Sequence, residues 1–248
     1  MKNPLKPKFL PWFTLGAGGA GLALRIWLFS ATDEKGLLPA SHPAIMLTFV
    51  LTAIILAVLA LGVRPLIPIS RYSRLFPASV LRTAGCAAGA AGILCAVISE
   101  TNFGDLITVL SLILGILGAV CLLYMGYCRF KGLHPSYLFP AAVTAYLMLH
   151  AVSQVRTWGS ETQLAVYFFP LLASIFLMLT AYYQTVLAVK KGSRRWFVFC
   201  SQAALFFCCL SFNSDNKLFY IGMALWTLAD ICALYTKPPR YIRQPENA

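Results

Sequence analysis

Long stretches without charge constrain this chain most. Eight mainly apolar runs follow one another along its 248 residues. A transmembrane helix needs about 20 such residues to cross a hydrocarbon core of about 30 Å. The runs are 10–31, 43–63, 77–99, 105–128, 135–155, 163–189, 196–212 and 217–236. They predict an all-α integral membrane protein with a single transmembrane domain over 1–248, a polytopic bundle of eight (alternatively seven) helices, the run 196–212 being the shortest.

The composition excludes a soluble protein. Charged residues make up 11% of the chain, hydrophobic residues 59%, and the mean hydropathy is +0.75. A soluble domain has about 25% charged residues and could not bury this much apolar surface. The net charge of +12 lies in short clusters between the runs, which is typical of contacts with anionic lipid headgroups and does not indicate nucleic-acid binding.

Helix is the expected element because backbone polar groups in hydrocarbon must bond within their own segment. A β-barrel strand would alternate with period two over about ten residues, whereas these runs are continuous and longer. Pro43, Pro77 and Pro135 stand near predicted helix starts, where a missing N–H is tolerated. Pro170 falls inside the sixth run, where we expect a kink.

The Lys and Arg residues predict the orientation. If the N-terminus is cytoplasmic and the runs alternate, fifteen Lys and Arg, with Arg129 and Lys131 among them, fall on the cytoplasmic side. Only Lys35, Arg156 and Lys217 fall on the other side, and Arg25 and Arg82 lie within runs. This bias predicts a cell-membrane protein with both termini cytoplasmic. The first run is longer than the apolar core of a signal peptide, so we expect it to be retained as a span.

Small residues stand in the first and third runs. Gly16, Gly18 and Gly21 reproduce the spacing of a dinucleotide-binding fingerprint, but no strand precedes them and they sit inside an apolar span. Small residues in membrane helices instead allow close backbone approach. Because Gly85 and Gly89 form a similar pattern, we expect the first and third spans to pack with these faces in contact.

Ionisable residues within spans are the candidate site, since such residues are costly in lipid and usually face the bundle interior. Arg25, Glu100 and His150 fall at similar depth near the outer side, with Gln154 one turn beyond His150. Arg25 is expected to pair with Glu100. The roles could equally be structural: Glu100 could be interfacial and His150 a core histidine.

A second polar layer is predicted near the cytoplasmic side. Asp230 is the single acid well inside a span, and Arg82, Gln184 and Gln202 fall at similar depth. Arg82 or Gln184 is the expected partner of Asp230. The alternative for Arg82 is to extend to the inner headgroups.

Recognisable catalytic and metal-binding patterns are absent from the sequence. There is no P-loop and no nucleophile-elbow or zinc-protease motif, and the eight cysteines contain no CxxC pair. We therefore expect no cofactor and no metal. Whether the chain is an enzyme is left open, with the balance against it.

The sequence identifies no substrate. The two polar layers, the kinked sixth helix and the lack of a soluble module suggest a small transporter or a membrane-embedded binder of a small or lipidic molecule. The first alternative is a non-catalytic accessory or scaffold subunit that packs against a membrane-protein partner. The second is a membrane-embedded lipid-modifying enzyme that would need Asp230 and His150 at one pocket.

Overall fold

The protein is a bundle of long helices. The computed structural model describes residues 9–31, 42–64, 79–99, 106–133, 135–158, 164–189 and 191–235, which contain helices and no strands. The helices are α1 (Leu10–Ser30), α2 (Pro43–Val63), α4 (Val80–Ser99), α5 (Leu106–Lys131), α6 (Leu138–Trp158), α7 (Leu164–Ala188), α8 (Arg194–Leu210) and α9 (Lys217–Tyr235). The all-helical prediction is confirmed.

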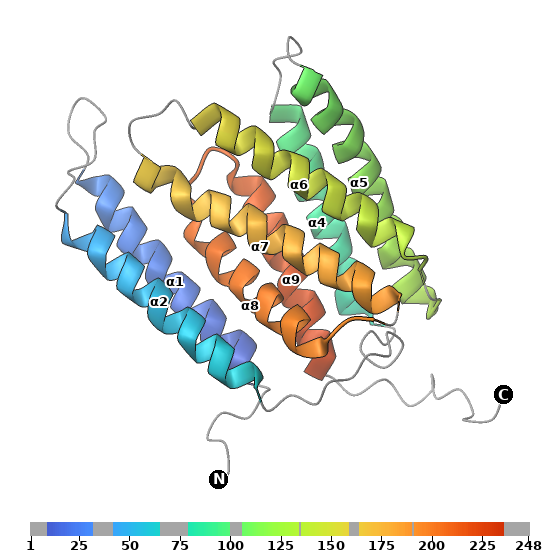
Figure 1. The fold of residues 1–248 in the computed structure, drawn as a ribbon, viewed down its shortest axis with the longest axis horizontal. Helices are drawn as coiled ribbons and strands as arrows, with labels where there is room; N and C mark the ends of the chain where they lie inside the picture. Colours follow the sequence, from blue (N-terminus) through green and yellow to red (C-terminus); the bar gives the residue numbers. More distant parts are fainter. Residues whose placement is uncertain are drawn as a thin grey trace.

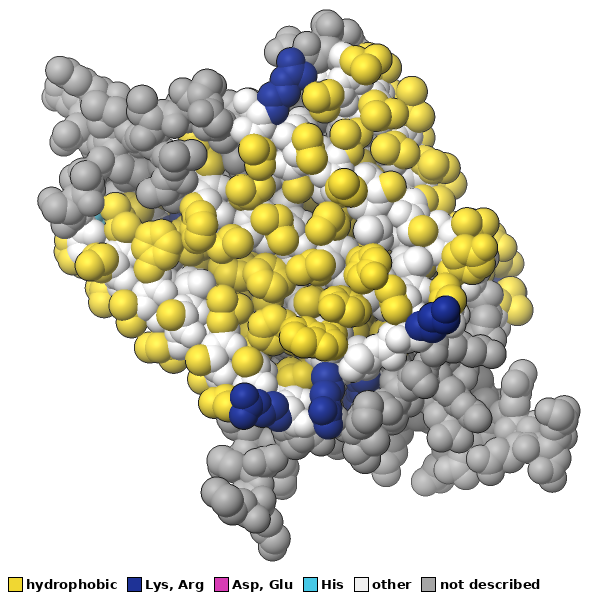
Figure 2. Space-filling model, viewed as in Figure 1, with side chains coloured by type: hydrophobic (Ala, Val, Ile, Leu, Met, Phe, Trp, Pro, Cys, Tyr) yellow, Lys and Arg dark blue, Asp and Glu magenta, His cyan; other side chains and the backbone are white. Residues whose placement is uncertain are grey.

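The outer surface of the bundle is suited to lipid. Large apolar side chains lie exposed on it, for example Met46, Ile98 and Leu106 at 73%, 71% and 85% of their full area. Figure 2 shows one face covered by such side chains, with Lys and Arg at its two ends. Apolar surface of this extent would be unstable in water. The chain is a multi-pass membrane protein.

Seven of the helices are long and apolar enough to span a membrane by themselves. The exception is α8, whose 17 residues give about 25 Å of rise. Nearly every residue of α8 from Phe197 to Leu210 is buried, so this helix contacts other helices rather than lipid. The predicted count of eight or seven spans therefore fits the structure, and α8 is the helix on which the two counts differ.

Six helices form a ring. Each of α4 to α9 packs on the next, and α9 packs on α4 to close the ring. In Figure 1, α6 and α7 lie in front of α4 and α9, while α5 and α8 close the two sides. The pair α1 and α2 stands outside the ring and packs on α8.

Successive helices run in opposite directions (Figure 1). We call the end where α1 begins and α9 ends the basic end. The described Lys and Arg near this end are Arg64, Arg82, Arg129, Lys131, Lys191, Arg194 and Arg195. At the opposite end they are Arg25, Arg156 and Lys217.

The boundaries differ from the predicted ones by up to three residues. Pro43 begins α2 as expected, but α6 starts at Leu138, three residues after Pro135; Pro77 lies outside the described residues. The helix α5 continues to Lys131 instead of ending near Cys128, because the chain after Cys128 keeps favourable helical packing through Arg129.

The predicted contact between the glycine faces of the first and third spans is wrong. In α1, a Cβ on Gly18 or Gly21 would meet Cys209 or Leu210 of α8. The glycines of α4 face other helices. A Cβ on Gly85 would meet Ala229, one on Gly89 would meet Trp226 and Leu122, and one on Gly92 would meet the backbone of Phe219 and Gly222. Small residues do allow close packing, as expected, but each set serves a different partner.

Candidate functional site

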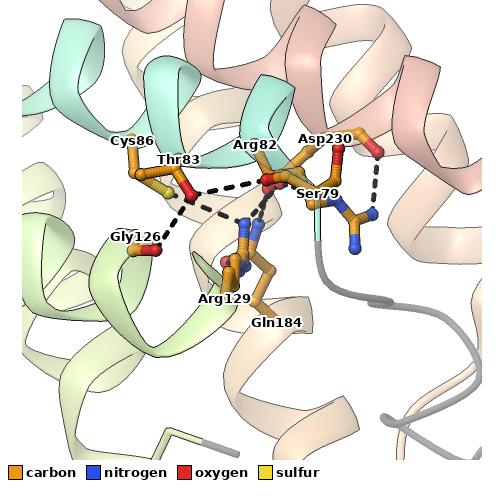
Figure 3. A network of polar contacts seen from close by, with 8 residues as sticks. All are labelled: Ser79, Arg82, Thr83, Cys86, Gly126, Arg129, Gln184 and Asp230. Carbon is orange, nitrogen blue, oxygen red and sulfur yellow. Dashed lines mark hydrogen bonds and ion pairs between the residues drawn. The ribbon is translucent and has the colours of Figure 1, made fainter. Parts of the chain in front are cut away.

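Four polar side chains from four helices meet near the basic end, and we call them the Asp230 cluster: Arg82 of α4, Arg129 of α5, Gln184 of α7 and Asp230 of α9 (Figure 3). Their exposed fractions are 0%, 2%, 0% and 1%. The cluster therefore joins four members of the six-helix ring through groups that have left both water and lipid.

Both carboxylate oxygens of Asp230 accept hydrogen bonds. Arg129 Nη1 donates to Oδ1 at 2.5 Å, and Gln184 Nε2 donates to Oδ2 at 2.5 Å. Arg82 Nε lies 3.4 Å from the same Oδ1, and Arg82 Nη2 donates to the backbone oxygen of Asp230 at 2.9 Å. Arg129 Nη2 also donates to Gln184 Oε1 at 3.4 Å, which closes the network.

The cluster carries more positive than negative charge. In the part of the chain that the structure describes, two guanidinium groups face one carboxylate, so the formal sum of these groups is one positive charge. Attraction between opposite charges is strong in a low-dielectric interior, but each buried ion still loses several kcal/mol of hydration. Asp230 is the described carboxylate that offsets this loss for both arginines.

Two residues beside the cluster bind its helices together. Thr83 Oγ1 donates to the backbone oxygen of Gly126 in α5 at 3.1 Å, and Arg129 Nη1 contacts Cys86 Sγ at 3.7 Å. A Cβ on Gly126 would already touch Cys86 at 3.0 Å. The close approach of α4 and α5 that Gly126 permits is what brings Arg129 within reach of Asp230.

Arg129 is the cluster member that the sequence analysis missed. It was counted among the cytoplasmic connections, whereas it lies buried within α5. The buried positions Ser111, Gly115, Gly118, Leu122 and Met125 recur every three or four residues along α5, and Arg129 continues this series. A helical stripe of small and apolar residues ending in a cation was the signal that could have placed it inside.

A second buried network lies nearer the opposite end, and we call it the Gln154 network. Gln154 of α6 contacts His150 Nε2 at 3.0 Å and donates to the Tyr220 hydroxyl of α9 at 2.7 Å. Ser174 of α7 donates to Gln154 Oε1 at 2.8 Å and to the backbone oxygen of Pro170 at 3.1 Å. The Tyr220 hydroxyl donates to that oxygen too, at 3.3 Å.

Arg25 has a partner that the sequence analysis did not predict. Its Nη1 donates to the backbone oxygen of Leu210 at 3.1 Å, and its guanidinium lies over the rings of Phe29 and Phe169. Leu210 ends α8, where backbone oxygens lack helical partners and carry partial negative charge. Glu100, the expected partner, lies outside the described residues. Arg25 thus joins α1 to the buried end of α8.

Of the remaining candidates, His150 lies in the Gln154 network and Gln202 lies in neither network. His150 packs between Tyr146 and Phe219 in the Gln154 network, so it shares no network with Asp230. The enzyme alternative would require these two residues at one pocket. Gln202 is fully buried in α8, and neither of its amide atoms has a hydrogen-bond partner among the described residues. No group of three or more His, Cys, Asp or Glu in the described part of the chain could hold a metal ion.

An apolar groove of about 430 Å³ lies on the surface between α6 and α7. Its lining includes Met148, Val152, Leu171 and Ile175, and it contains no member of the Asp230 cluster or the Gln154 network. The polar networks are therefore separate from this groove.

No protein-family model, curated protein or solved structure matches this chain.

Proposed function

We propose that the protein is a small transporter or membrane-embedded binder of a small or lipidic molecule, with its ligand path inside the six-helix ring. The observation that carries this proposal is the stacking of two buried polar networks along one ring. Asp230 and Tyr220 are ten residues apart on α9, and Gln184 and Ser174 are ten residues apart on α7. Ten helical residues correspond to about 15 Å.

The layer between the networks is mainly apolar, and its two buried threonines, Thr180 and Thr227, donate to backbone oxygens of their own helices. On α9 it includes Met223 and Trp226, and on α7 it includes Leu177 and Ala181, all buried. Polar groups inside a membrane bundle are costly and typically mark a ligand or ion path. The Asp230 cluster and the Gln154 network could close the two ends of a ligand path. This arrangement suits alternating access, in which one end opens while the other stays bonded.

The Asp230 cluster suits the role of the closure at the basic end. Its hydrogen bonds and ion pairs join α4, α5, α7 and α9, and one carboxylate holds both arginines. Weakening that carboxylate would loosen the polar contacts among four helices at once. A change at one shared acceptor therefore affects several contacts, whereas a closure made of independent ion pairs would need a change at each pair to open.

Orientation follows from the same proposal. The basic end would face the cytoplasm, in contact with anionic headgroups, and both termini would lie there. A reporter fused at residue 1 and another at residue 248 should be found in the same compartment. Reporters in opposite compartments would contradict this topology.

The closure is tested by labelling Cys86 with a membrane-impermeant maleimide applied at the basic end, followed by peptide mass spectrometry. Cys86 is fully buried beside Arg129, and Cys208 of α8 is an internal control with the same burial. Asp230→Asn should increase the labelling of Cys86 and leave that of Cys208 unchanged. If Cys86 stays unlabelled in the folded variant, the cluster is no closure.

The scaffold alternative has one observation in its favour. Gly16, Gly19, Ala20 and Ala23 form an exposed stripe on α1, and a Cβ on Gly16 or Gly19 would meet nothing within 4 Å. A photo-crosslinker at Ala20, compared with one at the exposed Ile98 of α4, decides between the alternatives. A scaffold subunit would give a protein adduct at Ala20 alone, whereas a transporter working by itself would give lipid adducts at both.

A further inference from the structure

We propose that the Asp230 cluster binds a phosphate group, which takes the place of the Asp230 carboxylate on Arg82 and Arg129. This inference rests on the proposed function and names its ligand class. Its first support is the charge balance within the described residues, where two buried guanidiniums face one carboxylate. A phosphate monoanion would make the sum of formal charges zero while Asp230 remains nearby.

The geometry of the donors also fits an oxyanion. Arg82 from α4 and Arg129 from α5 converge on one oxygen of Asp230, Oδ1. Guanidinium groups present planar sets of N–H donors that match phosphate and carboxylate oxygens. A phosphate offers three terminal oxygens, so two guanidiniums need not share one acceptor atom as they do on Asp230.

The depth of the cluster brings it close to the phosphate groups of the lipid headgroups. Arg82 is the third residue of α4, and Arg129 is the third from the end of α5. The 26 residues of α5 span about 39 Å, which exceeds the hydrocarbon thickness of about 30 Å. With α5 centred on the hydrocarbon core, the two arginines lie near its edge. A lipid headgroup or a phosphate from solution would then reach them when the closure at the basic end opens.

The basic end offers an anion little competition. Apart from Asp230 and Glu246, every acid in the sequence falls in segments that join helices at the opposite end. Exposed cations such as Lys191 and Arg195 lie at the basic end. The positive electrostatic potential of these cations raises the local concentration of anions and speeds their arrival. Asp230 is then the internal competitor that an arriving phosphate displaces.

The experiment uses the full chain in phosphatidylcholine nanodiscs and follows thermal unfolding. Inorganic phosphate is titrated against sodium chloride at equal ionic strength, and in a second arm phosphatidic acid replaces part of the phosphatidylcholine. We expect a saturable rise in the unfolding temperature with phosphatidic acid or with inorganic phosphate, larger than any rise with sodium chloride. A rise with phosphatidic acid alone assigns the site to a lipid headgroup, and a rise with inorganic phosphate assigns it to a soluble ligand.

Three variants make the test specific. Arg129→Gln should weaken phosphate binding by roughly 30-fold or more, as expected for loss of a buried charged contact. Arg195→Gln, at the same end but exposed, should keep the wild-type response. Asp230→Asn removes the internal competitor and should tighten binding by about tenfold, equivalent to one charge contact of ordinary strength.

The proposal is overturned if wild-type protein responds equally to phosphate and chloride in both arms. It is also overturned if Arg129→Gln and Arg195→Gln lose the response to the same extent, or if Asp230→Asn weakens binding. These outcomes are separate from the Cys86 labelling test. Opening without phosphate binding would refute the ligand class alone, while phosphate binding without any change at Cys86 would refute the closure.

Discussion

Replacing Asp230 with Asn should destabilise the bundle more than replacing either of the arginines beside it. Asp230→Asn keeps the volume of the side chain but removes the one described carboxylate that contacts two guanidiniums, 0% and 2% exposed. Loss of one partner of a buried ion pair typically costs about 3–5 kcal/mol, because the other charge remains desolvated. Here the remaining charge is double.

Arg129→Met has a smaller expected effect. It leaves Arg82 and Asp230 as a balanced pair with 3.4 Å between Nε and Oδ1. The losses are the hydrogen bonds of Arg129 to Asp230 and to Gln184, about 1–3 kcal/mol for acceptors left short of a donor. The difference between the two variants should therefore be about 2 kcal/mol in the free energy of unfolding.

Thermal unfolding can be followed with a thiol-reactive fluorescent dye, because most of the eight cysteines are buried and become reactive only on unfolding. For a chain of this length, 1 kcal/mol corresponds to about 2–4 °C in the midpoint. Asp230→Asn should lower the midpoint by about 6–20 °C, and Arg129→Met by clearly less. Asp215→Asn, an exposed acid outside the helices, is the control and should change stability by less than about 0.5 kcal/mol. Equal losses for Asp230→Asn and Arg129→Met would refute the argument from charge balance.

Three further changes test other parts of the bundle by the same unfolding assay. Gly222→Ala should cost about 1–3 kcal/mol, because its Cβ would lie 2.5 Å from a backbone oxygen of α4; Gly19→Ala, which enters open space, should change stability by less than about 0.5 kcal/mol. Gln202→Met should raise stability by about 1–3 kcal/mol, since the buried amide has no hydrogen-bond partner among the described residues, and an unchanged or lower midpoint would show that the amide is satisfied. Arg25→Met should lower stability by about 1–3 kcal/mol, because the oxygen of Leu210 at the buried end of α8 loses its donor; a midpoint equal to wild type would mean that this contact is dispensable.

The depth of the polar residues could be predicted from the sequence, and their helix neighbours could not. Depth depends on the distance along the chain to the nearest span end, and the spans were visible as apolar runs. Asp230, Arg82 and Gln184 were expected at one level and are in contact. The same reasoning placed Arg25 level with Glu100, which lies outside the described residues. It could not show that α1 packs on α2 and α8, which brings Arg25 to the backbone oxygen of Leu210.

Arg129 shows why a count of charges misses part of such a site. Near the end of a membrane helix, a cation that faces the headgroups and a cation that faces the bundle interior have the same distance to the nearest loop. Only the side of the helix separates them, and this side is set by contacts between segments far apart in the chain, such as that of Arg129 with Asp230, 101 residues away. The excess of Lys and Arg at one end predicts the same orientation whether or not Arg129 is counted. The charge pattern therefore cannot reveal that Arg129 was assigned to a connection instead of to the bundle interior. For this reason the periodicity of small residues along α5, which reports the buried side of the helix, is better evidence about Arg129 than its position in the charge pattern.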